Sequence, residues 1–347
     1  MGTKLMIADL RSDTVTKPTA AMQAYMMAAA VGDDVFGEDP SIHELEQYAA
    51  TLFGKEAAVF CPSGTMTNQI AIKLHTQPGD ELLCDAHAHI YNYEGGGISF
   101  NSGVQAKLLN GNEGRLSVEM IESNINADFD WLTRTSLVAL ENTVNRAGGS
   151  YYTIDQIRPI AALCRDKGLA LHLDGARIFN ALTVTGESPL AIGEQFDTIS
   201  ICLSKGLGAP VGSLLLGTTS HIKKARKIRK VFGGGMRQAG FLAAAGLYAL
   251  KHHTSRLHED HLRAAELAKV LCEMPYVKTV LPVYTNIVIF HLQPELINGT
   301  TFEQLMKEKG VRISAFGKDT IRMVTHLDFT NDHLEHTINC LKAVNKF

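Results

Sequence analysis

Two short segments contain the side chains whose chemistry is easiest to recognise in this sequence. In the first, an apolar run is followed by Asp174 and Arg177; in the second, a similar run is followed by Lys205. A lysine amine can form a Schiff base, a carboxylate can keep a ring nitrogen protonated, and an arginine can bind a substrate carboxylate. An enzyme that uses pyridoxal phosphate (PLP) needs these three groups, so the two segments predict such an enzyme.

Seven short apolar runs between residues 57 and 217 predict the sheet that would position these groups. Most of the runs are continuously apolar, which is typical of strands covered by helices on both faces. They are Ala57–Phe60, Glu81–Cys84, Gln105–Leu109, Ser136–Leu140, Ala170–Leu173, Thr198–Cys202 and Ser213–Leu216. The pattern predicts an α/β domain with a mostly parallel, seven-stranded sheet.

The character of the sequence changes after His252. A long amphipathic helix is expected over residues 255–274, then strands at Asn286–Leu292 and Ile321–Thr325, then a helix over residues 331–345. We therefore expect an N-terminal arm and large domain over residues 1–250, and a smaller α+β domain over residues 251–347. Ser41 with Glu44 has the form of a capping box at a helix start, and Pro18 is expected early in another helix.

The segment Cys61–Met66 joins a predicted strand to a predicted helix. Free N–H groups at a helix start form an anion site, so Gly64 and Thr65 are candidates to bind the PLP phosphate. An ordinary capped turn is the alternative. For Asp174 the alternative is a capping role on the following helix, and for Lys205 it is a solvated loop position.

The sequence from Asp85 to His89 contains two histidines and allows two functional interpretations. In the PLP interpretation His89 stacks on the cofactor ring and acts as an acid or base. In the other, His87 and His89 bind zinc together with Asp85, as in a metal hydrolase, although further ligands are not evident. A purely structural histidine is the third alternative.

Several charged segments are interpreted as solvated surface. They are the acidic loop Gly32–Pro40, whose spacing is not that of an EF-hand, the basic stretch Lys223–Lys230, and the group His252, His253, His258, Glu259, Asp260 and His261. Whether the acidic loop binds a cation is left open.

Composition and charge indicate which classes of partner and which cellular compartment to expect. The net charge of −3 argues against a nucleic-acid partner, and we see no stretch apolar enough for a bilayer span. The start, Met1–Ile7, is too short for a signal peptide. The six cysteines are scattered, which favours buried thiols in a reducing cytosol over disulfides or zinc ligands. We expect a cytoplasmic protein.

Taken together, these segments resemble the low-specificity L-threonine aldolases, PLP enzymes of fold type I, the aspartate-aminotransferase fold. The resemblance covers nearly the whole chain and rests on the order and number of its motifs. They are Asp9–Pro18, Val31–Pro40, Pro62–Met66, His172–Arg177, Leu203–Gly206 and Gly233–Gly240.

The resemblance implies a role for each site residue. Lys205 forms the Schiff base, Asp174 binds the pyridine nitrogen, and Gly64 with Thr65 binds the phosphate. The substrate carboxylate is assigned to Ser12, Arg177 and Arg322, with Arg177 also near the cofactor, and His89 lies over the ring beside Glu94. Relatives are generally homotetramers built from dimers, in which Arg237 is expected to reach a neighbour's phosphate.

One position departs from the family pattern. Where many relatives have a histidine, between Glu141-Asn142-Thr143 and Asn145, this chain has Val144. Valine cannot hydrogen-bond to a substrate hydroxyl, so the preference between L-threonine and L-allo-threonine is left open.

The expected reaction is retro-aldol cleavage of L-threonine or L-allo-threonine to glycine and acetaldehyde, with PLP bound to Lys205. Another PLP lyase of the same fold, eliminating a β-substituent from aromatic amino acids, is the nearest alternative. A metal hydrolase and a non-catalytic PLP-binding protein are weaker ones.

Overall fold

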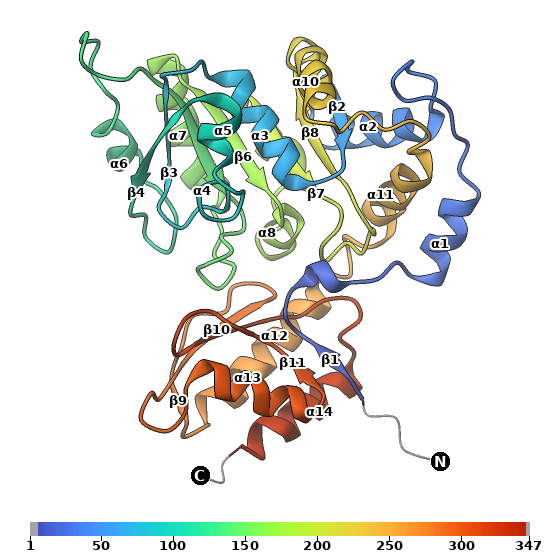
Figure 1. Ribbon diagram of the computed structural model, residues 1–347, viewed down its shortest axis with the longest axis vertical. Helices are drawn as coiled ribbons and strands as arrows, with labels where there is room; N and C mark the ends of the chain where they lie inside the picture. Colours follow the sequence, from blue (N-terminus) through green and yellow to red (C-terminus); the bar gives the residue numbers. More distant parts are fainter. Residues whose placement is uncertain (1–5, 345–347) are drawn as a thin grey trace.

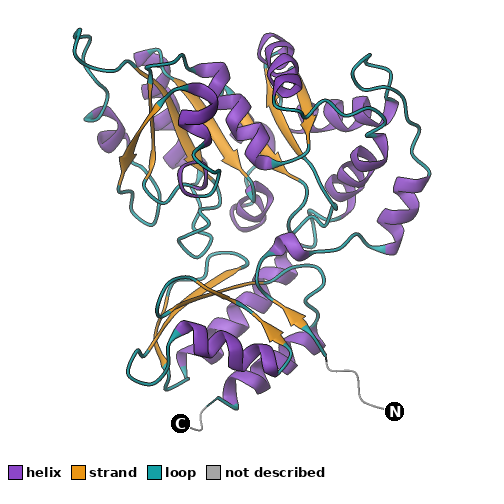
Figure 2. Ribbon diagram, viewed as in Figure 1, coloured by secondary structure: helices purple, strands orange, loops and turns teal. Residues whose placement is uncertain are grey.

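The computed structural model describes residues 6–344, which form two bodies joined at a waist (Figure 1). Figure 2 shows that strands lie inside the larger body with helices around them, and that the smaller body has its own sheet. Among the described residues, no helix is both long and apolar enough to cross a membrane.

The larger body is built on a seven-stranded sheet of order β2-β8-β7-β6-β5-β3-β4. Its strands are β2 (Ala57–Cys61), β3 (Glu81–Asp85), β4 (Gln105–Leu109), β5 (Thr135–Glu141), β6 (Ala170–Gly175), β7 (Thr198–Cys202) and β8 (Ser213–Gly217). Neighbouring strands are parallel except at β8, which is antiparallel to both β2 and β7. Each predicted apolar run overlaps one of these strands, so the predicted fold class is confirmed.

Helices cover the sheet, which explains why β3, β5, β7 and β8 are buried along their whole length. Helix α3 packs on β6, β7 and β8, and α7 packs on β6. The helices of this body are α1 (Ala20–Met27), α2 (Pro40–Leu52), α3 (Gly64–His75), α4 (His89–Asn92), α5 (Gly97–Ser102), α6 (Val118–Glu122), α7 (Ile154–Lys167), α8 (Ile178–Thr185), α9 (Pro189–Gly193), α10 (Thr219–Val231) and α11 (Gly240–His252).

The smaller body has a four-stranded antiparallel sheet and three helices, as expected for an α+β domain. The sheet order is β12 (Ser314–Ala315), β13 (Thr320–Val324), β10 (Ile287–Leu292) and β9 (Val277–Val280), and the helices are α12 (Leu257–Cys272), α13 (Gly299–Glu308) and α14 (Asn331–Lys342). The N-terminal strand β1 (Ala8–Asp9) pairs with β11 (Val311–Arg312), so the arm joins the smaller body. The domain boundary near residue 250 stays a prediction.

Two predicted helix starts were wrong by a few residues. The cap of α2 is Asp39, whose side chain accepts a hydrogen bond from the Ile42 N–H at 3.1 Å, because Pro40 occupies the first helical position. Helix α1 begins after Thr19, which caps it through the Met22 N–H, and Pro18 therefore precedes the helix.

Some charges predicted to be solvated are buried. Asp34 of the acidic loop pairs with Arg229 of the basic stretch at 2.6 Å, and each neutralises the other inside the protein. His253 and Asp260 are also buried, through contacts with the Leu207 carbonyl and Arg256. Conversely, Cys272 is exposed at the end of α12, whereas the other five cysteines are buried as predicted.

Candidate functional site

A pocket of about 200 Å³ lies where β6, β7 and the start of α3 meet. Carboxyl ends of parallel strands in open α/β sheets are the usual ligand site, because connecting loops diverge there. The lining side chains predicted from the sequence are Gly64, Thr65, His89, Glu94, Asp174 and Lys205. The fold therefore brings together six predicted residues from four separate segments.

The start of α3 forms one wall of this pocket. Ser63 caps the helix by accepting a hydrogen bond from the Met66 N–H at 3.1 Å, and the chain then passes through Gly64 and Thr65. A Cβ atom at Gly64 would lie 2.6 Å from the Cys202 sulfur, so glycine is required by close packing against the sheet. The first N–H groups of the helix have no partners within it and favour an anion.

Asp174 is the penultimate residue of β6 and is buried. Its Oδ1 accepts from the Ala176 N–H at 3.2 Å, and its Oδ2 accepts from the Asn68 amide at 3.0 Å. The cap position of α8 is Arg177, so the alternative of a helix-capping role for Asp174 was wrong.

His89 and Glu94 are joined by a hydrogen bond at the edge of the pocket. The His89 Nδ1 and Glu94 Oε1 atoms are 3.1 Å apart, and Glu94 also accepts from Asn68 at 2.9 Å and Gln69 at 2.7 Å. Burial alone would lower the pKa of His89, but the hydrogen bond to Glu94 and the charge of Asp174 outweigh it and raise that pKa. The pair can therefore take up or release a proton.

Lys205 lies in the loop after β7 and its side chain lines the pocket. The Gly208 N–H donates to the Lys205 carbonyl at 2.8 Å, and Gly208 has a φ of 78°, which favours glycine. This tight turn returns the chain to β8, and Lys205 and Asp174 line the same pocket.

Arg177 is engaged by a residue that we did not predict, Asp13. Its Nε and Nη2 atoms donate to the two carboxylate oxygens of Asp13, each at 2.7 Å, and both side chains are buried. Burial would raise the pKa of Asp13, but Arg177 holds it well below its ordinary value. Asp13 lies within the first motif of the family resemblance, which is the only signal that could have identified it.

Arg322 lies beside this pair. Its Nη1 donates to Asn145 Oδ1 at 2.9 Å and its Nη2 donates to the Arg11 carbonyl at 3.1 Å. Its buried Nε has no partner in the described structure, and burial with the nearby charge of Arg177 lowers the pKa of Arg322 to about 10. This guanidinium is therefore suited to receive a carboxylate. Ser12 caps the short 3-10 helix Asp13–Val15 next to it.

Glu141 is a second residue that sequence reasoning missed as part of the site. Its two oxygens accept from the backbone N–H groups of His89 and Asn145, each at 2.9 Å. Burial and the neighbouring charge of Asp174 raise the pKa of Glu141 to about 7. Glu141 thus anchors the backbone of His89, which lines the pocket, and of Asn145, which contacts Arg322.

The residues of the proposed zinc site are not assembled. Both Asp85 oxygens accept from backbone N–H groups, those of His87 and Gly111, each at 2.8 Å. His87 lies in a different pocket from His89. Within residues 6–344, the group close enough to hold a metal comprises His89, Glu94 and Asp174 instead. The structure therefore contradicts the alternative interpretation, in which Asp85, His87 and His89 would bind zinc together.

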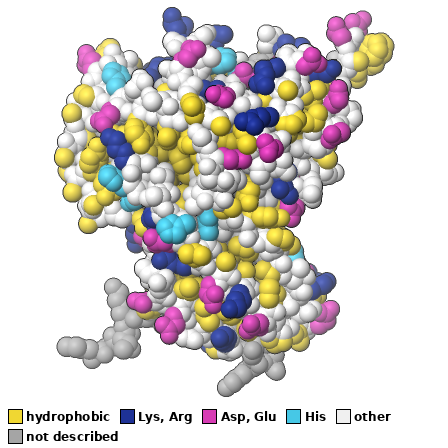
Figure 3. Space-filling model, turned by 180° about the vertical axis from the view of Figure 1, so that it is seen from behind, with side chains coloured by type: hydrophobic (Ala, Val, Ile, Leu, Met, Phe, Trp, Pro, Cys, Tyr) yellow, Lys and Arg dark blue, Asp and Glu magenta, His cyan; other side chains and the backbone are white. Residues whose placement is uncertain are grey.

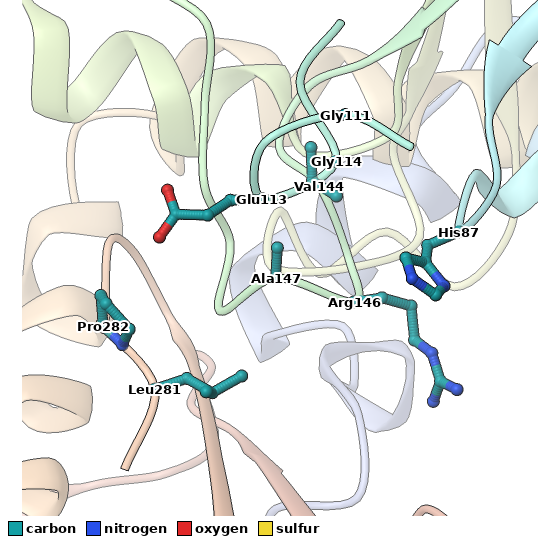
Figure 4. Close-up of a pocket in the computed structure, with 9 residues that line it drawn as sticks. All are labelled: His87, Gly111, Glu113, Gly114, Val144, Arg146, Ala147, Leu281 and Pro282. Atoms are coloured by element: carbon teal, nitrogen blue, oxygen red, sulfur yellow. The ribbon is translucent and has the colours of Figure 1, made fainter. Parts of the chain in front are cut away.

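That second pocket, of about 290 Å³, lies between the two bodies (Figure 4). Val144 and Arg146 line it on the side of the larger body, and Leu281 with Pro282 lines it on the side of the smaller one. Arg146 stacks over the rings of Tyr93, at 5.8 Å, and Phe316, at 4.8 Å, and Phe316 also lies under Arg322, at 4.4 Å. The pocket therefore lies next to Arg322.

Arg237 is not part of either pocket within this chain. Its side chain is largely exposed and pairs with Asp33 at 2.9 Å. Its predicted contact with a neighbouring subunit's phosphate stays a prediction.

Comparison with known proteins gives a consistent result. The pattern of the family described as beta-eliminating lyases matches residues 9–295. A low-specificity L-threonine aldolase of Escherichia coli K12 is 43% identical over 327 residues, 94% of this chain and 96% of that protein. One from Arabidopsis thaliana is 38% identical over 340 residues, 96% and 95% of the two chains.

Solved structures share the fold at lower identity. The threonine aldolase of Leishmania major has a TM-score of 0.84 at 21% identity and covers 97% of this chain and 99% of its own. A structure described as SPT with PLP internal aldimine has a TM-score of 0.73 at 17% identity, over 98% and 87% of the chains. The family and such neighbours imply dependence on PLP. The resemblance predicted from the sequence is confirmed, and the chain belongs to the beta-eliminating lyase family, among the low-specificity L-threonine aldolases.

Proposed function

We propose that this chain is a PLP-dependent carbon–carbon lyase that cleaves L-threonine and L-allo-threonine to glycine and acetaldehyde. The observation that supports this proposal best is the meeting of Lys205, Asp174 and the open start of α3 in one pocket. The curated relatives, at 43% and 38% identity over nearly the full chain, are named for this activity.

The donor set of the pocket fits PLP. The free N–H groups at Gly64 and Thr65 would hold the phosphate, the Lys205 amine would bind the aldehyde carbon, and Asp174 would face the pyridine nitrogen. When bound, PLP supplies an electron sink for the pair of electrons released by the breaking Cα–Cβ bond.

The chain's own residues would bind and orient the substrate. We assign its carboxylate to the Arg322 guanidinium, with Ser12 beside it. Arg177 was predicted to share this contact, but its strongest partner is Asp13, so we assign it chiefly to positioning. Its Nη1 reaches Asn145 Oδ1 at 3.5 Å, the same oxygen that Arg322 contacts. Fixing the carboxylate sets the direction of the bond to be broken.

His89 is the proposed base for the β-hydroxyl proton. With Nδ1–H donated to Glu94, the Nε2 atom of a neutral imidazole is free to accept that proton, and the Glu94 charge stabilises the imidazolium that forms. The His89 imidazolium can later give this proton back. Because this chain has Val144 where many relatives are expected to have a second histidine, we assign hydroxyl recognition to His89.

The decisive assay measures products from L-threonine with purified protein and added PLP. Acetaldehyde and glycine in equal amounts are expected. Release of ammonia with a 2-oxo acid would instead identify the β-eliminating alternative, and a colourless protein with tightly bound zinc would contradict the proposal altogether.

We further propose that the chain forms a homotetramer, a dimer of dimers, in the cytoplasm. Large hydrophobic side chains are exposed at Met27, Phe36, Phe100 and Val231. Figure 3 shows hydrophobic side chains gathering on the back of the larger body. Burying such surface favours association. Light scattering should give about four times the chain mass of 37.8 kDa; a monomeric mass would contradict this proposal.

A further inference from the structure

Behind Asp174 lies a line of buried polar side chains that the proposed mechanism does not use. It runs from Asn68 on α3 through His172 on β6 and Thr198 on β7 to His75 at the end of α3. Asn68, His172 and Thr198 are each nearly or fully buried. Polar groups placed so deeply need partners, so their hydrogen bonds fix one another's directions.

Asn68 joins the two functional carboxylates of the pocket. Its Nδ2 atom donates to Asp174 Oδ2 at 3.0 Å and to Glu94 Oε1 at 2.9 Å. Asn68 follows Gly64 by four residues, so it lies one turn below the proposed phosphate site on the same face of α3. One helix would therefore hold the phosphate and orient the carboxylate at the opposite end of the cofactor.

The two carboxylates determine which way the Asn68 amide points. Ionised carboxylates only accept hydrogen bonds, so the NH₂ group must face them and Oδ1 must face away. Oδ1 lies 3.1 Å from His172 Nε2. An amide oxygen also only accepts, so His172 must present Nε2–H to it.

The proton on His172 Nε2 determines the directions of the remaining hydrogen bonds, from His172 through Thr198 to His75. Burial lowers the pKa of His172 to about 4, so its ring is neutral and Nδ1 has no proton. Nδ1 then accepts from the Thr198 hydroxyl at 2.9 Å. The Thr198 oxygen in turn accepts from His75 Nε2 at 3.0 Å, and burial lowers the pKa of His75 to about 3.

One contact argues for the other tautomer. The Thr198 carbonyl lies 3.2 Å from His172 Nδ1 and would accept an Nδ1–H. That arrangement would set a bare Nε2 against Asn68 Oδ1, or would turn the amide oxygen toward both Asp174 and Glu94. Two repulsive contacts with carboxylates cost more than one weak carbonyl hydrogen bond gains, so we favour Nε2–H.

We propose that Asn68 is a positioning residue that aligns Asp174 and Glu94 together, and that His172, as the Nε2–H tautomer, fixes the orientation of the Asn68 amide. The proposal rests on the proposed PLP function for its consequence, because the Asn68 donor would orient the Asp174 carboxylate that faces the pyridine nitrogen. The hydrogen bonds that the proposal describes join side chains of this chain only, so they can be tested without PLP.

The tautomer can be tested without the cofactor. In full-length protein labelled with 15N-histidine, the resonances of His172 should show a protonated Nε2 and an unprotonated Nδ1 at neutral pH, assigned by their loss in His172→Gln. A protonated Nδ1 would overturn the proposal. This measurement holds even if the chain acts on another substrate, so its failure is distinct from failure of the proposed function.

Two matched pairs of variants test whether the alignment of Asp174 matters for PLP binding, and the dissociation constant of PLP is measured for each. Asn68→Leu should weaken PLP binding by about tenfold or more, the effect of losing a donor to a charged group. Gln69→Leu, which removes a donor to Glu94 but none to Asp174, should leave PLP affinity unchanged. Equal effects of the two variants would contradict the proposal.

The second pair replaces His172. Glutamine can place an N–H near the Nε2 position, whereas asparagine reaches only the Nδ1 position. His172→Gln should therefore retain PLP affinity within about threefold, and His172→Asn should lose about tenfold. Since both variants disturb the core alike, similar affinities for the two would show that the direction of the hydrogen bond does not matter.

Discussion

The buried pair of Asp13 and Arg177 can be tested against an exposed pair of the same geometry. Asp13 accepts two hydrogen bonds from Arg177, each at 2.7 Å, and its side chain is 0% exposed. Asp9 likewise accepts two from Arg11, at 2.8 and 2.6 Å, but these side chains are 19% and 48% exposed. Asp13→Asn and Asp9→Asn therefore make the same chemical change in two environments.

The expected costs differ by several kcal/mol. Asp13→Asn leaves the Arg177 charge buried without its counter-ion, and breaking a buried pair this way costs about 3–5 kcal/mol. Asp9→Asn removes a solvated pair, for which about 0–1 kcal/mol is typical. Folded domains are stable by only about 5–15 kcal/mol, so the first change removes a large share of the total.

The assay is urea unfolding at pH 7 with saturating PLP, comparing the midpoints of wild type and both variants. The difference between wild type and Asp13→Asn should shrink on acidification. The pKa of Asp13 is lower in the folded protein than its ordinary value of 3.8, so its stabilisation is present above about pH 4 and is lost as the pH falls further. If Asp13→Asn destabilises no more than Asp9→Asn, the assignment of Asp13 as the essential counter-ion of Arg177 is wrong.

Four further outcomes are expected. Lys205→Ala should abolish both the visible absorbance of bound PLP and the activity; retention of both would remove Lys205 from its role. Arg322→Ala should raise KM for threonine by about tenfold to a hundredfold, since a charged partner is lost, while PLP affinity stays unchanged. His172→Gln should reduce the pH dependence of the free energy of unfolding, because the pKa of His172 is lowered from 6.5 to about 4 on folding. Between pH 7 and pH 5 the wild type should lose about 2 kcal/mol of this free energy relative to the variant, as measured by urea unfolding. Val144→His should change the ratio of kcat/KM for L-threonine and L-allo-threonine, because this side chain lines the pocket beside Arg146; an unchanged ratio would exclude position 144 from hydroxyl recognition.

The sheet was predictable because of how it is covered. Helices on both faces require apolar side chains on both faces of a strand. Residues Ser136–Leu140 of β5 and all residues of β7 are apolar or small. The site residues at the ends of β6 and β7 followed from the same logic, since the carboxyl ends of neighbouring parallel strands meet at one edge. Asp174 and Lys205 could be placed together without any structure.

Helix starts were less predictable, because several residues near a start can serve as caps. Ser41 with Glu44 has the spacing of a capping box, yet Asp39 is the cap of α2. The fixed φ of Pro40 suits the first helical position, so the cap must be the residue before it. Reading Pro40 together with Asp39 would have given the observed start.

The roles of charged residues depended most on distant parts of the chain. Asp13 and Arg177 are 164 positions apart, and Asp34 and Arg229 are 195 apart. Each of these four looks like a solvated charge, or like a ligand for substrate, when its own segment is considered alone. A charge becomes tolerable in the interior only when its partner is also there, so burial of one residue is decided by the position of another.

Asp260 and Arg256 show where the sequence could have been read further. Arg256 is the N-cap residue of α12 and Asp260 follows it by four positions, a spacing at which side chains meet on one helix face. The two form an ion pair, with Asp260 fully buried. The interpretation of this segment as solvated surface did not take into account that Arg256 and Asp260 have the spacing of an ion pair. A local partner at helical spacing is visible in one sequence, whereas the partner of Arg177 is supplied by the fold. That difference explains why the residue types of the site could be predicted from the sequence, whereas the pairing of Arg177 with Asp13 could not.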